Sequence, residues 1–132
     1  MVNETSIVLQ VRALGKRVDN GGEPLTILHE NSFVVAGGDT VAIIGASGSG
    51  KSTLLGLLAG LDQPSSGTVI LANQDLGRLD EDARAILRGR LIGFVFQNFQ
   101  LLPSFTALEN VMLPLELAEA ANARGEAEFW LQ

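Results

Sequence analysis

Several residue types are absent or scarce in this chain of 132 residues. It has no cysteine, which excludes disulfides and thiolate metal sites and is typical of a reducing compartment. No apolar run approaches the roughly 20 residues that a membrane-spanning helix needs. The first residues have neither the basic stretch nor the apolar core of a secretion signal. The sequence therefore predicts a cytoplasmic protein that reaches a membrane only through a partner.

Basic residues are also few. Nine lysines and arginines stand against 15 aspartates and glutamates, which gives a formal net charge of -6. Because such a chain has no long-range positive field to attract a phosphodiester backbone, we expect no nucleic-acid partner. The single histidine, His29, is expected to be a surface or turn residue without chemistry. Hydrophobic residues make up 46% of the chain and are spread along it, which favours one globular unit.

A glycine-rich segment at residues 45–52 fits the pattern G-x-x-x-x-G-K-[ST] at every position. Glycines allow positive φ and bring backbone N–H groups close to anionic oxygens. Lys51 would place its charge at the β- and γ-phosphates, and the Ser52 hydroxyl would bind Mg²⁺. A chance match is expected in well under about 1% of chains this long. The sequence therefore predicts binding of ATP with Mg²⁺ by Gly45, Ala46, Ser47, Gly48, Ser49, Gly50, Lys51, Ser52 and Thr53.

The residues around this segment predict a strand, a glycine loop and a helix in that order. Residues 40–44 are β-branched and apolar, and leucines at helical spacing follow Lys51 as far as Gly60. Further strands are expected at residues 7–13, 32–35, 68–71 and 91–96, with a loop at 15–24 and a tight turn at 36–39. Helices are expected at residues 80–90, at 107–118 with a bend near Pro114, and from Glu126 onward. In the first of these helices we expect an ion pair between Asp80 and Arg84.

A second motif narrows the class of nucleotide-binding protein. Residues 92–103 read IGFVFQNFQLLP and residues 106–111 read TALENV, and both resemble the glutamine-loop region of ABC-type ATPases. Residues 61–69 and 79–84 are similar to the lipoprotein-release and macrolide-export branch of that family. The resemblance implies an α/β fold: a P-loop NTPase (RecA-like) core with an N-terminal antiparallel β subdomain and the beginning of the helical subdomain. It also implies that Gln97 contacts the metal or the attacking water.

The same resemblance implies an organisation and a set of partners. Residues 1–44 would form the β subdomain and lead-in strand, 45–60 the phosphate loop and its helix, 61–97 the run to the glutamine loop, and 98–132 the start of the helical subdomain. The chain would be the ATP-binding, energy-coupling subunit of a transporter or lipoprotein-release complex. Its partners would be an integral membrane permease-like subunit at the cytoplasmic face of the inner membrane and, for the complete domain, a second copy. Leu102, Phe105 and Leu108 are the expected contacts with the membrane subunit.

Departures from the family pattern suggest an alternative function. Val18 stands where the family usually has an aromatic residue that stacks on adenine, and the chain has no tyrosine. No signature motif, no apolar strand ending in Asp-Glu and no switch histidine follow Gln97. We therefore expect a C-terminally truncated domain, with a nucleotide-binding fragment without hydrolytic activity as the alternative function. A small P-loop kinase or GTPase is disfavoured because no guanine-reading Asn-Lys-x-Asp motif is present.

Overall fold

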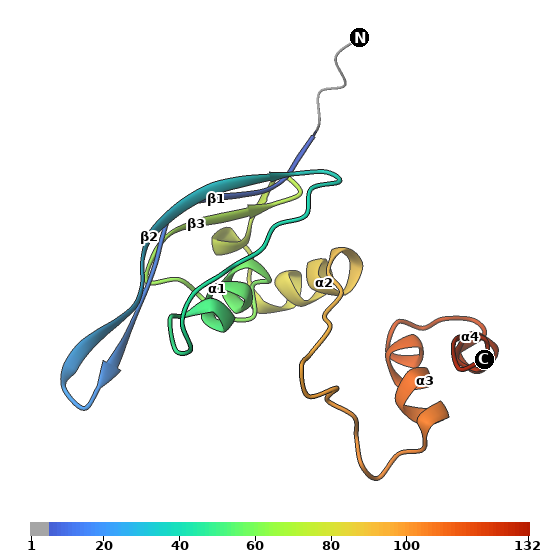
Figure 1. The fold of residues 1–132 in the computed structure, drawn as a ribbon. Helices are drawn as coiled ribbons and strands as arrows, with labels where there is room; N and C mark the ends of the chain where they lie inside the picture. The colour runs from blue at the N-terminus through green and yellow to red at the C-terminus, as the bar shows by residue number, and fades with distance from the viewer. Residues whose placement is uncertain (1–5) are drawn as a thin grey trace. The chain divides into compact units, whose positions relative to one another are not determined.

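The computed structural model describes residues 6–132, which form two compact units that meet in sequence between Ile92 and Gly93 (Figure 1). Each unit is described here by itself. The first unit contains β1 (Ile7–Asn20), β2 (Glu23–Ala36), α1 (Lys51–Leu58), β3 (Ser66–Leu71), β4 (Gln74–Asp75), a short 3-10 turn (Leu76–Arg78) and α2 (Glu81–Leu91). The second contains α3 (Ala107–Leu117) and α4 (Ala123–Trp130).

The first unit is built on an antiparallel sheet with the strand order β2-β1-β3-β4. The prediction of a loop at residues 15–24 was wrong, because β1 and β2 continue through them to a two-residue turn. Gly21 and Gly22 form that turn with φ of 70° and 99°. Positive φ at both central positions matches the twist of the flanking strands, so two glycines suffice to close a long hairpin.

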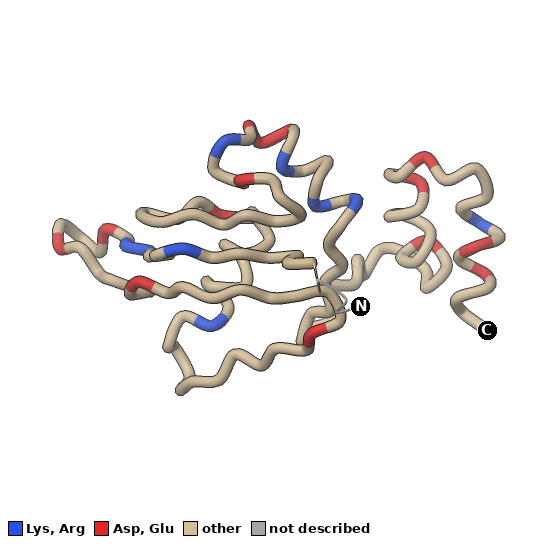
Figure 2. Tube along the Cα trace, turned by 90° about the horizontal axis from the view of Figure 1, so that it is seen from above, with Lys and Arg blue, Asp and Glu red and all other residues tan. Residues whose placement is uncertain are grey.

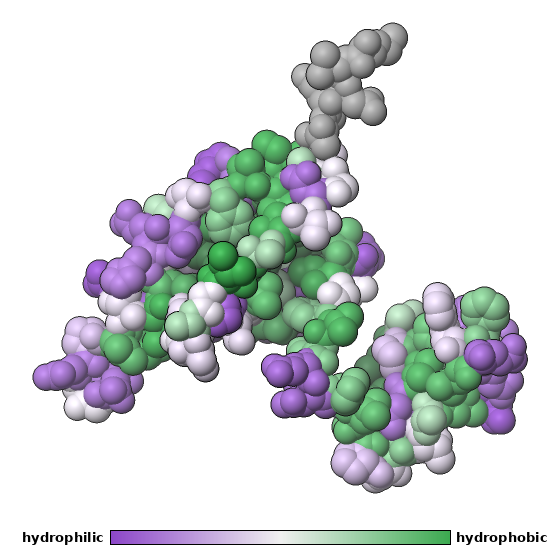
Figure 3. All heavy atoms as spheres, viewed as in Figure 1, coloured by the Kyte–Doolittle hydropathy of each residue, from purple (hydrophilic) through white to green (hydrophobic). Residues whose placement is uncertain are grey.

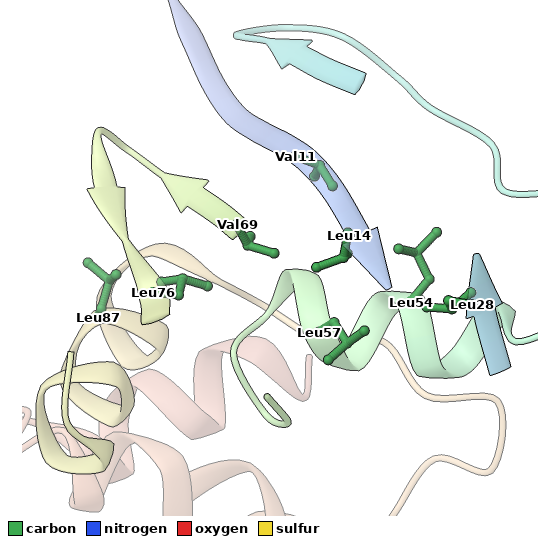
Figure 4. Packing of buried hydrophobic residues seen from close by; sticks show 8 residues of the cluster. All are labelled: Val11, Leu14, Leu28, Leu54, Leu57, Val69, Leu76 and Leu87. Atoms are coloured by element: carbon green, nitrogen blue, oxygen red, sulfur yellow. The ribbon is translucent and has the colours of Figure 1, made fainter. Parts of the chain in front are cut away.

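Helix α1 packs on the sheet through a small apolar core (Figure 4). Leu54 and Leu57, one turn apart on α1, point toward the sheet, and Leu14 of β1 is fully buried beneath them. The 3-10 turn and α2 add one leucine each to the same cluster. The core residues are Val11, Leu14, Leu28, Leu54, Leu57, Val69, Leu76 and Leu87. Burial of α1 against the sheet fixes the helix whose first residue is Lys51.

Two predicted strands do not form. Residues 39–46 and 92–96 are extended but belong to no ladder of the described sheet, and α2 takes Leu91 into its last turn. The Ile44 and Val95 side chains are almost fully exposed, at 91% and 102%. A strand exists only through hydrogen bonds to a neighbour, so apolar and β-branched composition without a paired neighbour leaves an extended segment. The tight turn at residues 36–39 is present, with Asp39 N–H donating to the Ala36 carbonyl at 3.1 Å.

Helix α2 was predicted to within one residue at each end, but its ion pairing was not. The Asp80 carboxylate accepts the Ala83 N–H at 2.8 Å and caps the helix. It is therefore engaged with the backbone, and the expected pair with Arg84 does not form. Arg84 is instead bound by Glu81, with 2.9 Å between Nη2 and Oε2.

The second unit pairs α3 with α4. Thr106 and Glu109 form a reciprocal capping box at the start of α3, and the Thr106 N–H and hydroxyl lower the pKa of the Glu109 carboxyl. Helix α4 begins at Ala123, three residues before the predicted start, because Asn122 caps it, and it ends at Trp130. Pro114 lies within α3 as expected. No helix among residues 6–132 has the length and apolar character needed to cross a bilayer.

Candidate functional site: a glycine loop at the start of a helix

The loop of residues 45–50 runs into the first turn of α1, as the motif requires. Gly48 and Gly50 have φ of 78° and 88°, values that side-chain-bearing residues rarely adopt. The Leu54 N–H is the first in the helix to donate to a backbone carbonyl, that of Gly50, at 2.8 Å. Within residues 6–132, no backbone carbonyl accepts the N–H groups of Lys51, Ser52 or Thr53. These donors and the positive end of the helix dipole form a site for an anion.

Lys51 turns its ammonium group back over this loop. Its Nζ atom donates to the carbonyl oxygens of Gly45 at 2.8 Å and Ala46 at 2.6 Å. The Ser49 hydroxyl lies 3.5 Å from the same atom. The ammonium group is thus bound by carbonyl oxygens of the loop itself. This arrangement places a positive charge next to the free N–H groups at the helix start, where it adds to their attraction for phosphate.

The Ser52 hydroxyl offers one hard oxygen ligand at the same end of α1. Ser52 is exposed, and its hydroxyl makes no hydrogen bond within the described part of the chain. No group of three or more His, Cys, Asp or Glu side chains that could hold a metal ion occurs among residues 6–132. Mg²⁺ characteristically binds through few protein ligands plus substrate phosphates and water. The donor set therefore fits a magnesium ion that arrives with a polyphosphate.

The loop rests on β2. A Cβ atom on Gly50 would lie 2.9 Å from both the Ile27 carbonyl oxygen and a Leu28 methyl carbon, so the backbone approaches β2 as closely as only glycine allows. Leu28 also lines a pocket of about 440 Å³. The pocket lining is completed by Gly15, Lys16, Arg17, Thr26, His29, Glu30 and Ser66. A cavity with polar and apolar walls thus lies beside the strand that supports the loop.

Val18 lies near the tip of the hairpin, opposite Leu25. Its side chain is 38% exposed and lines a separate pocket of about 350 Å³ with Arg17, Asp19, Gly22 and Pro24. His29, to which the sequence assigned no chemistry, lines the larger pocket on β2. The role of Val18 toward a nucleotide base remains a prediction.

Gln97 belongs to the second unit and lies in a turn, with an exposed side chain. It follows the extended segment in which the Phe94 and Phe96 rings stack at 5.5 Å. That i, i+2 stacking retains the side-chain alternation expected of a strand. The contact of Gln97 with the metal or the attacking water remains a prediction.

The segment after Gln97 is organised by one side chain. The Asn110 amide oxygen accepts the Leu102 N–H at 2.8 Å, and its nitrogen donates to the carbonyls of Leu102, Phe105 and Thr106. Beside this loop is a pocket of about 400 Å³ with mostly apolar walls, and apolar side chains cover much of the visible face of this unit (Figure 3). Its lining consists of Leu101, Leu102, Pro103, Phe105, Ala107, Asn110, Val111 and Leu131. Of the three expected partner contacts, Leu102 and Phe105 line it, while Leu108 does not.

Sequence reasoning missed the charged contacts that hold the segment after α1. Lys16 on β1 pairs with Asp62 at 2.7 Å and donates to the Gln63 carbonyl at 2.7 Å. Its ammonium group lowers the pKa of the Asp62 carboxyl. Arg88 on α2 donates to the Gly60 carbonyl at 2.6 Å. Partners this far apart in sequence leave no periodic signal, and only the path of the chain brings them together.

Comparisons with known proteins identify the family of the chain. Residues 28–132 match the model of the ABC transporter family. The chain is 52% identical over 114 residues to the lipoprotein-releasing system ATP-binding protein LolD of Pseudomonas syringae pv. tomato, covering 86% of this chain and 50% of that protein. It is 51% identical over 127 residues to the ABC transporter ATP-binding protein YbbA of Escherichia coli strain K12, covering 95% of this chain and 56% of that protein.

A solved structure agrees as well. The ATP-binding cassette MJ0796, solved as a dimer bound to ADP and Pi, superposes with a TM-score of 0.82 at 37% identity, over 90% of this chain and 53% of that one. The chain thus spans about half the length of the curated relatives it matches. The predicted fold class and the resemblance to the lipoprotein-release branch are confirmed. With a glycine loop seated at the start of α1 and a family match over most of its length, this chain belongs to the ABC transporter family of ATP-binding proteins.

Proposed function

We propose that the chain binds Mg-ATP through residues 45–53 and serves as the ATP-binding part of an ABC-type transporter or lipoprotein-release complex. The observation that carries the proposal is the loop itself. Gly48 and Gly50 turn with positive φ, Lys51 lies over the loop, and the first N–H groups of α1 are free of backbone acceptors in the described chain. Ser52 would hold the magnesium ion and Lys51 the β- and γ-phosphates. Bound magnesium would neutralise phosphate charge.

The direct test is substitution of Lys51. Lys51→Ala removes the cation and should weaken Mg-ATP binding at least about tenfold, since charged hydrogen bonds contribute roughly 1.5–3 kcal/mol. Isothermal titration calorimetry measures the dissociation constant. Arg90→Ala is the matched control, because it removes one exposed positive charge from α2 and Arg90 makes no ion pair among residues 6–132. Equal affinity of wild type and Lys51→Ala would overturn the proposal.

Turnover separates two candidate functions. In the first, the chain is part of an ATPase in which Gln97 contacts the metal or the attacking water. In the second, it is a nucleotide-binding fragment that does not hydrolyse ATP. The chain spans about half the length of its curated relatives, and Gln97 is its proposed catalytic residue, so hydrolysis is the property to measure. Phosphate release above the level of a Lys51→Ala preparation favours the first function, and binding without release favours the second.

The partners follow from the relatives and from the second unit. One relative is named for a lipoprotein-releasing system, and MJ0796 was solved as a dimer. We propose that the complete domain pairs with a second copy and docks on an integral membrane subunit at the cytoplasmic face of the inner membrane. The apolar pocket beside Leu102 and Phe105 would receive that subunit. Crosslinking from a cysteine introduced at Phe105 to the membrane subunit tests this assignment.

A further inference from the structure

The C-terminal end of α1, opposite the phosphate loop, is fixed by contacts of its own. Gly60 terminates the helix with φ of 67°, while the Leu61 N–H donates to the Gly56 carbonyl at 2.9 Å. The Gly60 carbonyl, which lies beyond the last helical turn, accepts Arg88 Nη1 at 2.6 Å. A guanidinium at this position complements the negative end of the helix dipole. Helix α2 therefore holds the C-terminal end of α1 through a charged hydrogen bond.

One carboxylate, that of Glu81, binds Arg88 and its neighbour on the helix, Arg84. Glu81 Oε1 lies 2.8 Å from Arg88 Nη2, and Glu81 Oε2 lies 2.9 Å from Arg84 Nη2. The Arg84 side chain is 8% exposed and lies beside the Gln63 amide, whose oxygen would accept from both terminal nitrogens of Arg84 once the amide is turned over. Figure 2 shows acidic positions at the start of α2 and basic positions along the rest of the helix. We call Glu81, Arg84 and Arg88 the α2 clamp.

The α2 clamp adds directional contacts to the apolar packing of α1. Leu54 and Leu57 bury one face of α1, but the hydrophobic effect that drives their burial is non-directional. Charged hydrogen bonds are short and directional. Because α1 is a single helix of eight residues, a shift at Gly60 is carried along its axis to Lys51 and Ser52.

We propose that Glu81, Arg84 and Arg88 are positioning residues for the phosphate loop, acting through α1. The proposal rests on the proposed function. The clamp fixes the axial position of α1 so that the N–H groups of its first turn and the Lys51 ammonium converge on the same phosphates. None of the three clamp residues touches the loop, and the nearest contact is with Gly60 at the opposite end of the helix.

The test uses the full chain with Arg88→Ala, Arg88→Lys and the matched control Arg90→Ala. Mg-ATP affinity is measured by calorimetry on folded protein. Arg88→Ala should weaken binding about three- to tenfold, a share of what a charged hydrogen bond contributes. Arg90→Ala should stay within about twofold of wild type, since Arg90 is exposed on the same helix. Arg88→Lys should fall between them, because an ammonium lacks the planar fork that reaches Gly60 and Glu81 together.

A second readout needs no nucleotide. The amide signals of Gly48 and Gly50 in a ¹H–¹⁵N spectrum should move in Arg88→Ala and not in Arg90→Ala. A purely local role at Gly60 would leave both glycine signals in place. If Arg88→Ala does not fold, Arg88→Lys and Glu81→Gln carry the same comparison. Unmoved glycine signals and unchanged affinity in the folded variants would overturn the proposal that the α2 clamp positions the phosphate loop.

The two proposals fail in different ways. If wild type and Lys51→Ala bind Mg-ATP equally, the proposed function fails, while the glycine signals still report on the clamp. If Lys51→Ala loses binding and the Arg88 variants match wild type in both readouts, the clamp alone fails.

Discussion

At the scale of single residues, the site depends on positions where the backbone needs glycine and where one side chain directs charge. Gly50 combines positive φ with an approach to β2 that leaves no room for a methyl group. The motif predicted this glycine from sequence, because phosphate loops require it. The contact with Ile27 and Leu28 could not be predicted, since it depends on how β2 passes under the loop.

Gly50→Ala should therefore destabilise the first unit and weaken ATP binding. The added Cβ meets the Ile27 carbonyl at 2.9 Å, and the left-handed backbone adds strain, for a total of about 1–3 kcal/mol. Urea unfolding and calorimetry measure the two effects. Gly56→Ala is the matched control, because nothing lies within 4 Å of its added Cβ and α1 gains a better helix former. Equal stability of the two variants would contradict this account.

Val18→Tyr should tighten ATP binding if Val18 is the base-stacking position that the family resemblance implies. An aromatic ring stacked on a base contributes roughly 1–3 kcal/mol, so a gain of about tenfold is expected. Inorganic tripolyphosphate, which has no base, serves as the control ligand and should bind both proteins equally. A gain for both ligands, or for neither, would remove Val18 from the base site.

At the scale of elements, α1 and α2 have their start and stop signals in the sequence, and both were predicted within two residues. The charged contacts that join the two helices were not predicted. The sequence favoured Asp80 with Arg84 on spacing alone, but Asp80 caps the helix and Glu81 takes the arginines. Capping wins because the backbone N–H groups at a helix start have no other protein acceptor.

The tie between α1 and α2 should depend on pH through Glu81. Hydrogen bonds from Arg88 first, and then from Arg84, lower the pKa of the Glu81 carboxyl. Its contribution to stability is therefore complete above the ordinary glutamate pKa of about 4.3 and is lost as the pH falls through the lower folded value. Urea unfolding of wild type and Glu81→Gln from pH 7 to pH 3 measures the contribution. The difference between the two proteins should shrink on acidification, and a constant difference would contradict the assignment.

At the scale of the whole molecule, the sequence predicted the family and the order of elements but assigned two strands that do not form. Residues 40–44 and 92–96 have strand composition, and the Phe94 and Phe96 rings keep strand alternation. Periodicity reports which side chains share a face, not whether a neighbouring strand is there to bond. The long hairpin was missed because most side chains at residues 15–24 are polar and exposed. Such residues show no alternation of apolar and polar positions, even though they lie in strands.

Exposed extended segments of this composition should cause self-association as the protein concentration rises. Residues 92–96 combine β-branched and aromatic side chains with unpaired backbone and no charge. Val95→Lys should raise the concentration at which light scattering detects assembly, by about tenfold or more. Leu117→Lys is the control, since Leu117 is 77% exposed but its backbone lies in α3. The same effect from both substitutions would show that apolar area, not the unpaired segment, drives association.

The pairing of β1 with β3 has a consequence for the order in which the protein becomes functional. Leu9 pairs with Leu71, and the phosphate loop and α1 lie between these two positions in the chain. Closing that ladder encloses the whole nucleotide segment in one chain loop, whose closure entropy is spent before its contacts are gained. The β1–β3 ladder can therefore close only after the whole nucleotide segment has been synthesised. During synthesis, affinity for nucleotide should emerge only after β3 has left the ribosome, although Lys51 leaves it earlier.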